Sequence, residues 1–293
     1  MKKVRLGINE KALPAEFSWE EKFQLVKSLG FSFIELSIDE SDERIQRLEW
    51  TKEESQQLRE ISQRFDIQIK TIMLSALRKY PLGSADPGIY RLAYGMARQA
   101  IILAKNLGCG TVQLAGYDEY YLPKSSGGPN RFYQNLERIT QFAAREQVMV
   151  TVETMDDKFI NTVQKVAELK MVIKSPWLAA YADLGNLTAW QGNNPKLVAV
   201  DLKANQEIIA AIHVKDTKPV TNDFPGVFKD VSLGEGTVNF DYLFNVLYRS
   251  GYQGTFTIEL WTERAVDCLK KLQLAKDFVT EKLEAAGYEI TVS

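Results

Sequence analysis

Short apolar runs alternate with longer amphipathic segments along the whole of this chain of 293 residues. The short runs have the length of buried strands, and the longer segments repeat their apolar positions at helical spacing. Eight strands are predicted, at residues 4–8, 33–38, 67–74, 112–115, 148–152, 178–182, 208–212 and 255–258. Eight helices are predicted, at about residues 19–29, 52–65, 89–107, 131–146, 160–173, 195–207, 240–249 and 266–286.

Capping signals mark the ends of several of these helices. Ser18 stands three residues before Glu21, and Thr51 stands three residues before Glu54. This spacing forms a capping box, which opens a helix. Gly30 follows the first predicted helix, and glycine commonly ends a helix because it tolerates the left-handed conformation. These signals support the alternation of strands and helices.

Strict alternation over this length indicates parallel strands that are joined by helical crossovers. Eight such units fit a closed (β/α)8 barrel, the TIM barrel, which is the fold class that we predict. A doubly wound open sheet is the alternative, but no G-x-G-x-x-G motif follows the first strand. No linker or low-complexity segment divides the chain, so we expect one barrel domain over residues 1–293.

Composition excludes several classes of partner. The net charge is −2, so the chain lacks the basic excess that attracts nucleic acid. No window approaches the roughly 18 consecutive apolar residues of a membrane span, and the first residues lack the apolar run of a signal peptide. Two cysteines are too few for a disulfide framework. We therefore expect a cytoplasmic protein that binds neither nucleic acid nor membranes.

The only histidine, His213, lies at the end of the seventh predicted strand, where the chain changes from apolar to polar. A lone histidine is most often a hydrogen-bonded core residue, but here three other strands end in a carboxylate. Glu153 follows the fifth strand, Asp183 the sixth and Glu259 the eighth. Positions 153, 183 and 213 are evenly spaced by about one strand–helix unit, so we expect equivalent strand ends.

The carboxyl ends of barrel strands converge on one mouth, so these four residues are expected side by side. Without a cation the group would be costly to bury, because the carboxylates repel each other. Three carboxylates and one imidazole suit one divalent ion, such as Zn²⁺, Mn²⁺, Mg²⁺ or Co²⁺. Each carboxylate alone could cap a helix or lie on the surface, but the four together predict a metal site.

Further polar groups are expected around the four, in or just after the predicted strands, at Glu35, Gln113, Asn186, Lys215 and Asp216. Asn186 could bind substrate or could simply cap the next segment. Lys215 could pair with Asp216 or with a neighbouring strand, so we expect it beside the metal ligands.

Six motifs, which span nearly the whole chain, together resemble one family of the xylose-isomerase-like barrel superfamily. The motifs are Glu10–Pro14, Pro81–Ser84, Gln113–Asp118, Asp183–Leu187, His213–Pro219 and Gly234–Gly236. They are similar to those of the L-ribulose-5-phosphate 3-epimerases of L-ascorbate catabolism, also called L-xylulose-5-phosphate 3-epimerases. No motif is specific alone, but the set is.

The resemblance implies both the metal ligands and the reaction. The family binds one divalent ion through Glu, Asp, His and Glu, which match Glu153, Asp183, His213 and Glu259. Its members invert C3 of a ketose phosphate by removing the C3 proton and returning a proton to the other face, while the ion stabilises the enediolate. Glu153 and Glu259 are the predicted catalytic residues, because Asp183 lies between them in strand order. A homodimer is common in the family and is expected here.

A substrate phosphate needs cations or loop amides. Barrels often bind phosphate near the loops that follow strands seven and eight, where Lys218 and Lys229 lie. Lys11 follows the first strand. With Asn186 and Lys215, these lysines are the predicted substrate- and phosphate-binding residues, although each lysine could equally be a solvated surface charge.

One residue departs from the family pattern. Leu77 stands where the family has a histidine, and we expect it at the end of the third strand, facing the mouth. The difference favours a slower enzyme, another sugar or, in the extreme, a non-catalytic sugar-phosphate-binding barrel. A hexulose-6-phosphate 1,2-isomerase, which needs the same metal and bases, and an inosose dehydratase are the alternatives on the same scaffold.

Overall fold

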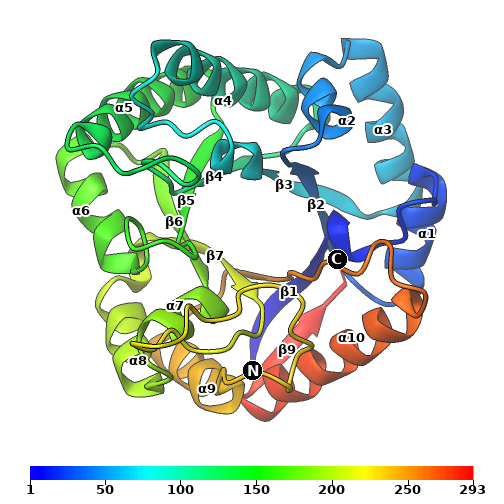
Figure 1. Cartoon of the computed structure of the whole chain (residues 1–293). Coiled ribbons are helices and arrows are strands. Elements are labelled where there is room, and N and C mark those ends of the chain that lie inside the picture. The colour runs from blue at the N-terminus through cyan, green and yellow to red at the C-terminus, as the bar shows by residue number, and fades with distance from the viewer. Residues whose placement is uncertain (293) are drawn as a thin grey trace.

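A computed structural model describes residues 1–292 and shows eight parallel strands inside a ring of helices (Figure 1). The barrel strands are β1 Lys2–Asn9, β2 Phe33–Ile38, β3 Gln68–Leu74, β4 Thr111–Ala115, β5 Met149–Glu153, β6 Leu178–Asp183, β7 Ile209–Val214 and β8 Thr255–Ile258. β1 pairs in parallel with both β2 and β8, which closes the sheet into a barrel. The predicted (β/α)8 fold is therefore confirmed, and the open sheet is wrong.

The major helices lie outside the barrel, close to their predicted positions (Figure 1). They are α1 Trp19–Ser28, α3 Lys52–Phe65, α4 Pro87–Leu107, α5 Gly128–Glu146, α6 Val163–Ile173, α8 Pro195–Ala204, α9 Phe240–Ser250 and α10 Cys268–Ala285. Both predicted capping boxes are present. α5 begins at Gly128 rather than Arg131, because Pro129 fits a first helical turn, where no N–H partner is needed. None of the helices in residues 1–292 is long and apolar enough to cross a membrane.

Several shorter elements were not predicted. The short helices α2 Asp42–Ile45 and α7 Leu184–Trp190 each follow a barrel strand directly or closely, and four 3-10 turns are present within residues 1–292. Among these turns, η1 Glu10–Ala12 follows β1 and η3 Ser75–Arg78 follows β3. A ninth strand, β9 Tyr288–Thr291, follows α10 and pairs in parallel with the first half of β1. The predicted count of eight strands is thus one too low.

Polar side chains replace apolar ones inside the barrel toward the carboxyl ends of its strands. Glu35, Glu153, Asp183 and His213 are all buried there, whereas the side chains between barrel and helices are apolar. Asp183 and His213 are register partners on β6 and β7, so their side chains start from neighbouring points of the sheet. A buried group of this kind is costly unless its charges are paired or hold a cation, which makes this end of the barrel the candidate site.

Glu10, in η1, is expected to be a strong contributor to the stability of the barrel. Its fully buried carboxylate accepts hydrogen bonds from Arg47 at 2.6 and 2.9 Å and from the Ser37 N–H at 3.0 Å. Glu10→Gln would leave the arginine buried beside a neutral group. We expect the free energy of unfolding to fall by about 3 kcal/mol, measured by urea denaturation.

The matched control is Glu20→Gln, which removes an exposed ion pair with Arg64 and should cost less than about 1 kcal/mol. Burial alone would raise the pKa of Glu10, but Arg47 and other cations outweigh burial and lower it below 4.5. The stabilisation by Glu10 is therefore present above about pH 4.5 and is lost as the pH falls through the folded-state pKa. Equal losses in the two variants would contradict this account.

Candidate active site

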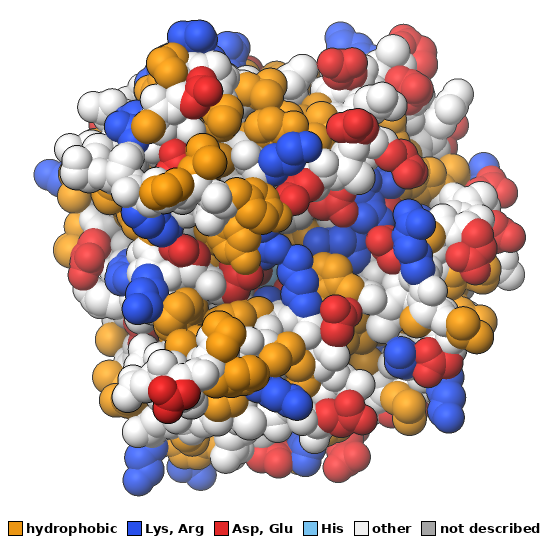
Figure 2. Space-filling view, viewed as in Figure 1, with side chains coloured by type: hydrophobic (Ala, Val, Ile, Leu, Met, Phe, Trp, Pro, Cys, Tyr) orange, Lys and Arg blue, Asp and Glu red, His pale blue; other side chains and the backbone are white. Residues whose placement is uncertain are grey.

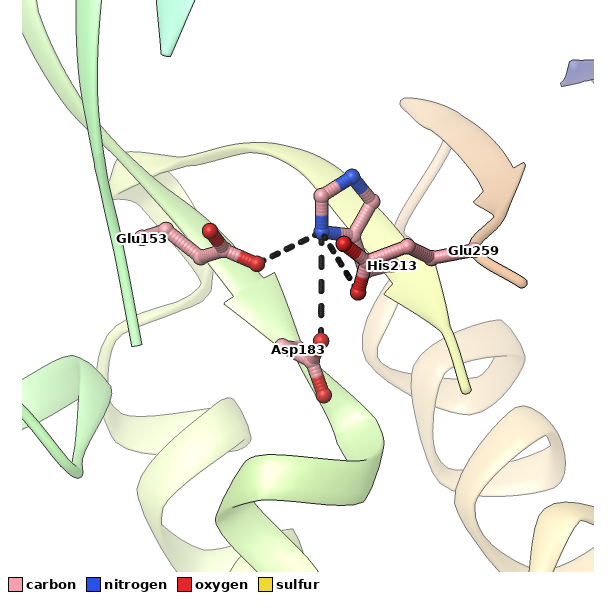
Figure 3. A group of neighbouring side chains, drawn as sticks. All are labelled: Glu153, Asp183, His213 and Glu259. Atoms are coloured by element: carbon pink, nitrogen blue, oxygen red, sulfur yellow. Dashed lines mark hydrogen bonds and ion pairs between the residues drawn. The ribbon is translucent and has the colours of Figure 1, made fainter. Parts of the chain in front are cut away.

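Four side chains converge at the carboxyl ends of β5 to β8 (Figure 3). Glu153 and Asp183 are the last residues of β5 and β6, His213 lies near the end of β7, and Glu259 directly follows β8. Each residue offers one ligand atom, and these atoms all lie within 4.8 Å of one another. All four side chains are buried. The structure thus brings together the four residues that the strand ends predicted.

One ring nitrogen of His213 faces the three carboxylates, and the other points away from them. Nδ1 is 2.7 Å from Glu153 Oε1, 3.8 Å from Asp183 Oδ2 and 3.9 Å from Glu259 Oε2. Figure 3 shows these three carboxylates around one ring nitrogen, with the other nitrogen pointing away. That second nitrogen, Nε2, is 2.8 Å from Glu35 Oε1. The ring is therefore held at both nitrogens.

The donor atoms of this group fit a divalent cation. The buried oxygens Asp183 Oδ2 and Glu259 Oε2 contact the Lys215 ammonium at 2.9 and 3.1 Å. One lysine does not balance the charge of three buried carboxylates, which repel each other and are costly to bury. A divalent cation among three carboxylates and one imidazole would balance that charge.

Two neighbouring carboxyls of the group have opposite pKa shifts. Burial, with the nearby charges of Glu259 and Glu153, raises the pKa of Asp183 to about 7 against the opposing effect of Lys215. Burial also acts to raise the pKa of Glu259, but Lys215 and His213 outweigh it and lower that pKa to about 2. Burial thus dominates at Asp183, whereas the neighbouring positive charges dominate at Glu259.

A cavity of about 260 Å³ opens above the group at the mouth of the barrel. Figure 2 shows charged side chains of both signs around the hollow at the centre of this face. Glu153, Glu259 and Asn186 line its floor, and its walls include the cations Lys11, Arg78, Lys215 and Lys229 and the aromatic residue Trp261. Carboxylates also line the walls, so the cavity suits a small polar ligand; they are Asp39, Glu40, Asp156 and Glu263.

Trp261 lies at the centre of the lysines in this wall. The ammonium groups of Lys11, Lys215 and Lys229 are 5.3, 5.3 and 5.5 Å from the centroid of its ring. Burial lowers the pKa of Lys229, and the positive charges of Arg78 and Lys11 lower it further. The carboxylates of Asp156 and Glu259 act on Lys229 in the opposite direction, so positive and negative charges lie side by side in this wall.

Comparison with known proteins shows the family to which this chain belongs. The profile of the xylose isomerase-like TIM barrel family matches residues 23–281. The chain is 40% identical over 286 residues to L-ribulose-5-phosphate 3-epimerase UlaE of Escherichia coli O157:H7 (strain EC4115 / EHEC), covering 98% of this chain and 97% of UlaE. The chain belongs to the L-ribulose-5-phosphate 3-epimerase family. It is an enzyme of the sugar epimerase class, as its motifs predicted.

A second relative and two solved structures are also similar to this chain. The epimerase is 41% identical over 288 residues to SgbU of Escherichia coli K12, covering 98% of this chain and 99% of SgbU. D-psicose 3-epimerase of Clostridium cellulolyticum H10, solved with D-tagatose, superposes with a TM-score of 0.75 at 14% identity over 96% of this chain and 99% of that one. A structure of L-ribulose 3-epimerase gives a TM-score of 0.74 at 18% identity, over 97% and 95% of the two chains. At these identities the two structures show the shared fold.

The structure places most of the predicted substrate-binding residues of the epimerase at the cavity. Lys11, Asn186, Lys215 and Lys229 line it. Lys218 does not: it is exposed in the loop after β7, where its backbone pairs with that of Val227. Asn186 donates its side-chain amide to the Thr154 carbonyl at 2.8 Å. Of the two alternatives for Lys215, the structure shows the pairing with neighbouring strands, through contacts with Asp183 and Glu259.

The prediction that Leu77 faces the mouth is wrong. Leu77 is fully buried in the hydrophobic core, because β3 ends at Leu74 and Leu77 lies in the η3 turn rather than at the strand end. Ser75 and Arg78, from the same turn, line the cavity in its place. A leucine in that position therefore fills the core of the epimerase and leaves the cavity wall to its neighbours.

Arg78 and Trp261 are among the cavity residues of the epimerase that sequence reasoning missed. Arg78 donates to the Tyr117 hydroxyl at 2.8 Å and to Asp156 at 3.1 Å, which fixes the guanidinium in the cavity wall. Trp261 lies two residues beyond Glu259, in the loop after β8. A signal existed for both, because each closely follows the end of a predicted barrel strand.

The long loop between β7 and α9 is held over the site by Asp216. The Asp216 carboxylate accepts hydrogen bonds at 2.9 to 3.1 Å from four backbone N–H groups, those of Thr217, Gly234, Gly236 and Val238. A Cβ at Gly236 would lie 2.1 Å from Asp216 Oδ1, so only glycine fits. Asp216 therefore acts on the loop and not as a partner of Lys215.

Proposed function

We propose that this enzyme is a metal-dependent 3-epimerase of a ketose phosphate, interconverting L-ribulose 5-phosphate and L-xylulose 5-phosphate. The observation that carries the proposal is the buried group of three carboxylates and one imidazole, which offers four ligand atoms within 4.8 Å. The identity to UlaE, which is named for this substrate, supports the choice of sugar. Glu153, Asp183, His213 and Glu259 would hold one divalent ion, such as Zn²⁺, Mn²⁺, Mg²⁺ or Co²⁺.

Two residues of the group are suited to move protons at C3. Glu153 and Glu259 approach the centre of the group from opposite sides (Figure 3), so one can remove the C3 proton and the other can protonate the opposite face. Asp183, whose strand lies between theirs in the barrel, completes the ligand set. The divalent ion, when bound, supplies Lewis-acid stabilisation of the negative charge that develops on the substrate oxygens. The Lys215 ammonium, beside Asp183 and Glu259, adds positive charge at the same place.

The substrate phosphate is assigned to Lys11, Arg78 and Lys229, the cations on the wall above the group. Lys11→Met should raise the KM for the sugar phosphate by about 10- to 100-fold, which corresponds to the loss of one charged hydrogen bond. The KM for the unphosphorylated ketose should stay the same. Lys218→Met, which removes an exposed lysine outside the cavity, is the matched control. Steady-state kinetics with both sugars measure the effect, and equal changes for both sugars would contradict the assignment.

The reaction itself is tested in D₂O with metal-loaded enzyme and L-ribulose 5-phosphate. A 3-epimerase forms L-xylulose 5-phosphate with deuterium at C3, detected by NMR. A 1,2-isomerase would instead form an aldose phosphate with deuterium at C2, and its reverse reaction would place deuterium at C1 of the ketose. A non-catalytic binding protein would do neither. The expected homodimer and the cytoplasmic location stay predictions, and light scattering after size-exclusion chromatography checks the former.

A further inference from the structure

Glu35 contacts His213 at Nε2, the ring nitrogen that points away from the other three carboxylates (Figure 3). Its Oε1 is 2.8 Å from His213 Nε2 and accepts a second hydrogen bond, also of 2.8 Å, from the Asn9 side-chain amide. Glu35 is completely buried, and its other oxygen has no hydrogen-bond partner within residues 1–292. A carboxylate buried in this way costs several kcal/mol, and the proposed proton transfers do not use it.

We propose that Glu35 is a positioning residue for the metal site, which holds the His213 ring so that Nδ1 faces the other ligands. This inference rests on the metal-dependent function proposed above. An imidazole can bind a metal only through a nitrogen that carries no proton, and the partner of the other nitrogen decides which one that is. A carboxylate at Nε2 keeps the proton on Nε2 and leaves Nδ1 free to bind the ion.

Asn9 holds Glu35 in turn and connects it to the cavity wall. Asn9, the last residue of β1, and Glu35, in the middle of β2, are register partners, and their side chains are hydrogen-bonded to each other. The Asn9 side-chain oxygen accepts a hydrogen bond from the Lys11 N–H at 2.9 Å, which caps the η1 turn. One asparagine thus orients both the carboxylate behind His213 and the turn that carries a cavity lysine.

Direct metal titration by calorimetry tests the role of Glu35. Metal-free wild-type protein is compared with Glu35→Gln and Glu35→Leu, using Zn²⁺ and Mn²⁺. We expect affinity about 10-fold weaker for the glutamine variant, whose amide oxygen can still accept, and up to about 100-fold weaker for the leucine variant. Thr151→Val is the matched control, because it changes a buried barrel residue whose hydroxyl has no hydrogen bond within residues 1–292. If the leucine variant does not fold, the glutamine variant carries the test.

The orientation of the ring can be read directly, because His213 is the only histidine in the chain. Histidine labelled with ¹⁵N in untagged protein gives one pair of ring-nitrogen signals by NMR. With Zn²⁺, wild-type protein should show the proton on Nε2, and Glu35→Leu should lose this single form. A wild-type protein that takes up no divalent ion would overturn the proposed function together with this inference. If wild type binds metal, and both Glu35 variants bind it equally well with unchanged ring signals, the role of Glu35 alone is overturned.

Discussion

Epimerisation is expected to fall by about 10²- to 10⁴-fold in Glu153→Gln and, separately, in Glu259→Gln, which is the range of general acid–base catalysis. Each change keeps the size of the side chain and removes one group that can exchange a proton. Inversion of C3 needs a proton transfer on both faces, and the two glutamates approach from opposite sides (Figure 3). Neither can therefore replace the other, and conversion of a single epimer followed by NMR measures the loss.

Proton exchange should separate the two variants. Exchange of the C3 proton with D₂O needs only the base on the face where that proton lies. With one epimer as substrate, one variant should still exchange its C3 proton without forming product, and the other should do neither. Starting from the opposite epimer should exchange the behaviour of the two variants, because the proton then lies on the other face.

Two controls distinguish the loss of a base from the loss of the metal. Both glutamates are also proposed ligands, so the metal content of each variant must be determined beside its rate. Glu40→Gln, which changes a carboxyl lining the same cavity outside the group of four, should keep the wild-type rate. If both variants hold metal and neither reaction slows by even about tenfold, the two-base mechanism is wrong for this enzyme.

His213→Ala is expected to abolish tight binding of divalent metal while the barrel stays folded. The alanine removes the one ligand that no other residue can supply, since the chain has no second histidine. The loss should exceed the roughly 10- to 100-fold cost of losing an outer partner of a ligand. Metal analysis after chelation and reloading measures binding, and circular dichroism checks the fold. Wild-type metal content in a folded variant would refute the ligand assignment.

The strand ends could be predicted from the sequence because a barrel repeats one local unit. Glu153, Asp183 and His213 are evenly spaced, and parallel strands bring such positions to one end of the sheet. The chemistry of the group then follows from residue types alone. The prediction needed only the count of strands and helices, and an error of one or two residues at a boundary did not affect it.

The cavity wall could not be predicted in this way, because turns and loops that carry no periodic pattern build it. Leu77 and Arg78 are adjacent, yet the η3 turn directs the first into the core and the second into the cavity. Asp183 is both a member of the group and the cap of α7, where it accepts a hydrogen bond from Asn186 N–H at 2.7 Å. β9 has only four residues, which is too short for a clear alternation.

The pairing of β1 has a consequence for how this chain folds as it leaves the ribosome. Arg5 pairs with Thr255 on β8 and with Thr291 on β9, so these partners are separated by about 250 residues or more along the chain. At typical rates of synthesis, roughly 5–20 residues per second, β1 waits about 10–50 seconds for them. During this interval only β2 can pair with it natively, and the growing sheet has an open edge. A ribosome that stalls before β8 is made would therefore hold a barrel that has not closed. Its open sheet edge would be a substrate for chaperones.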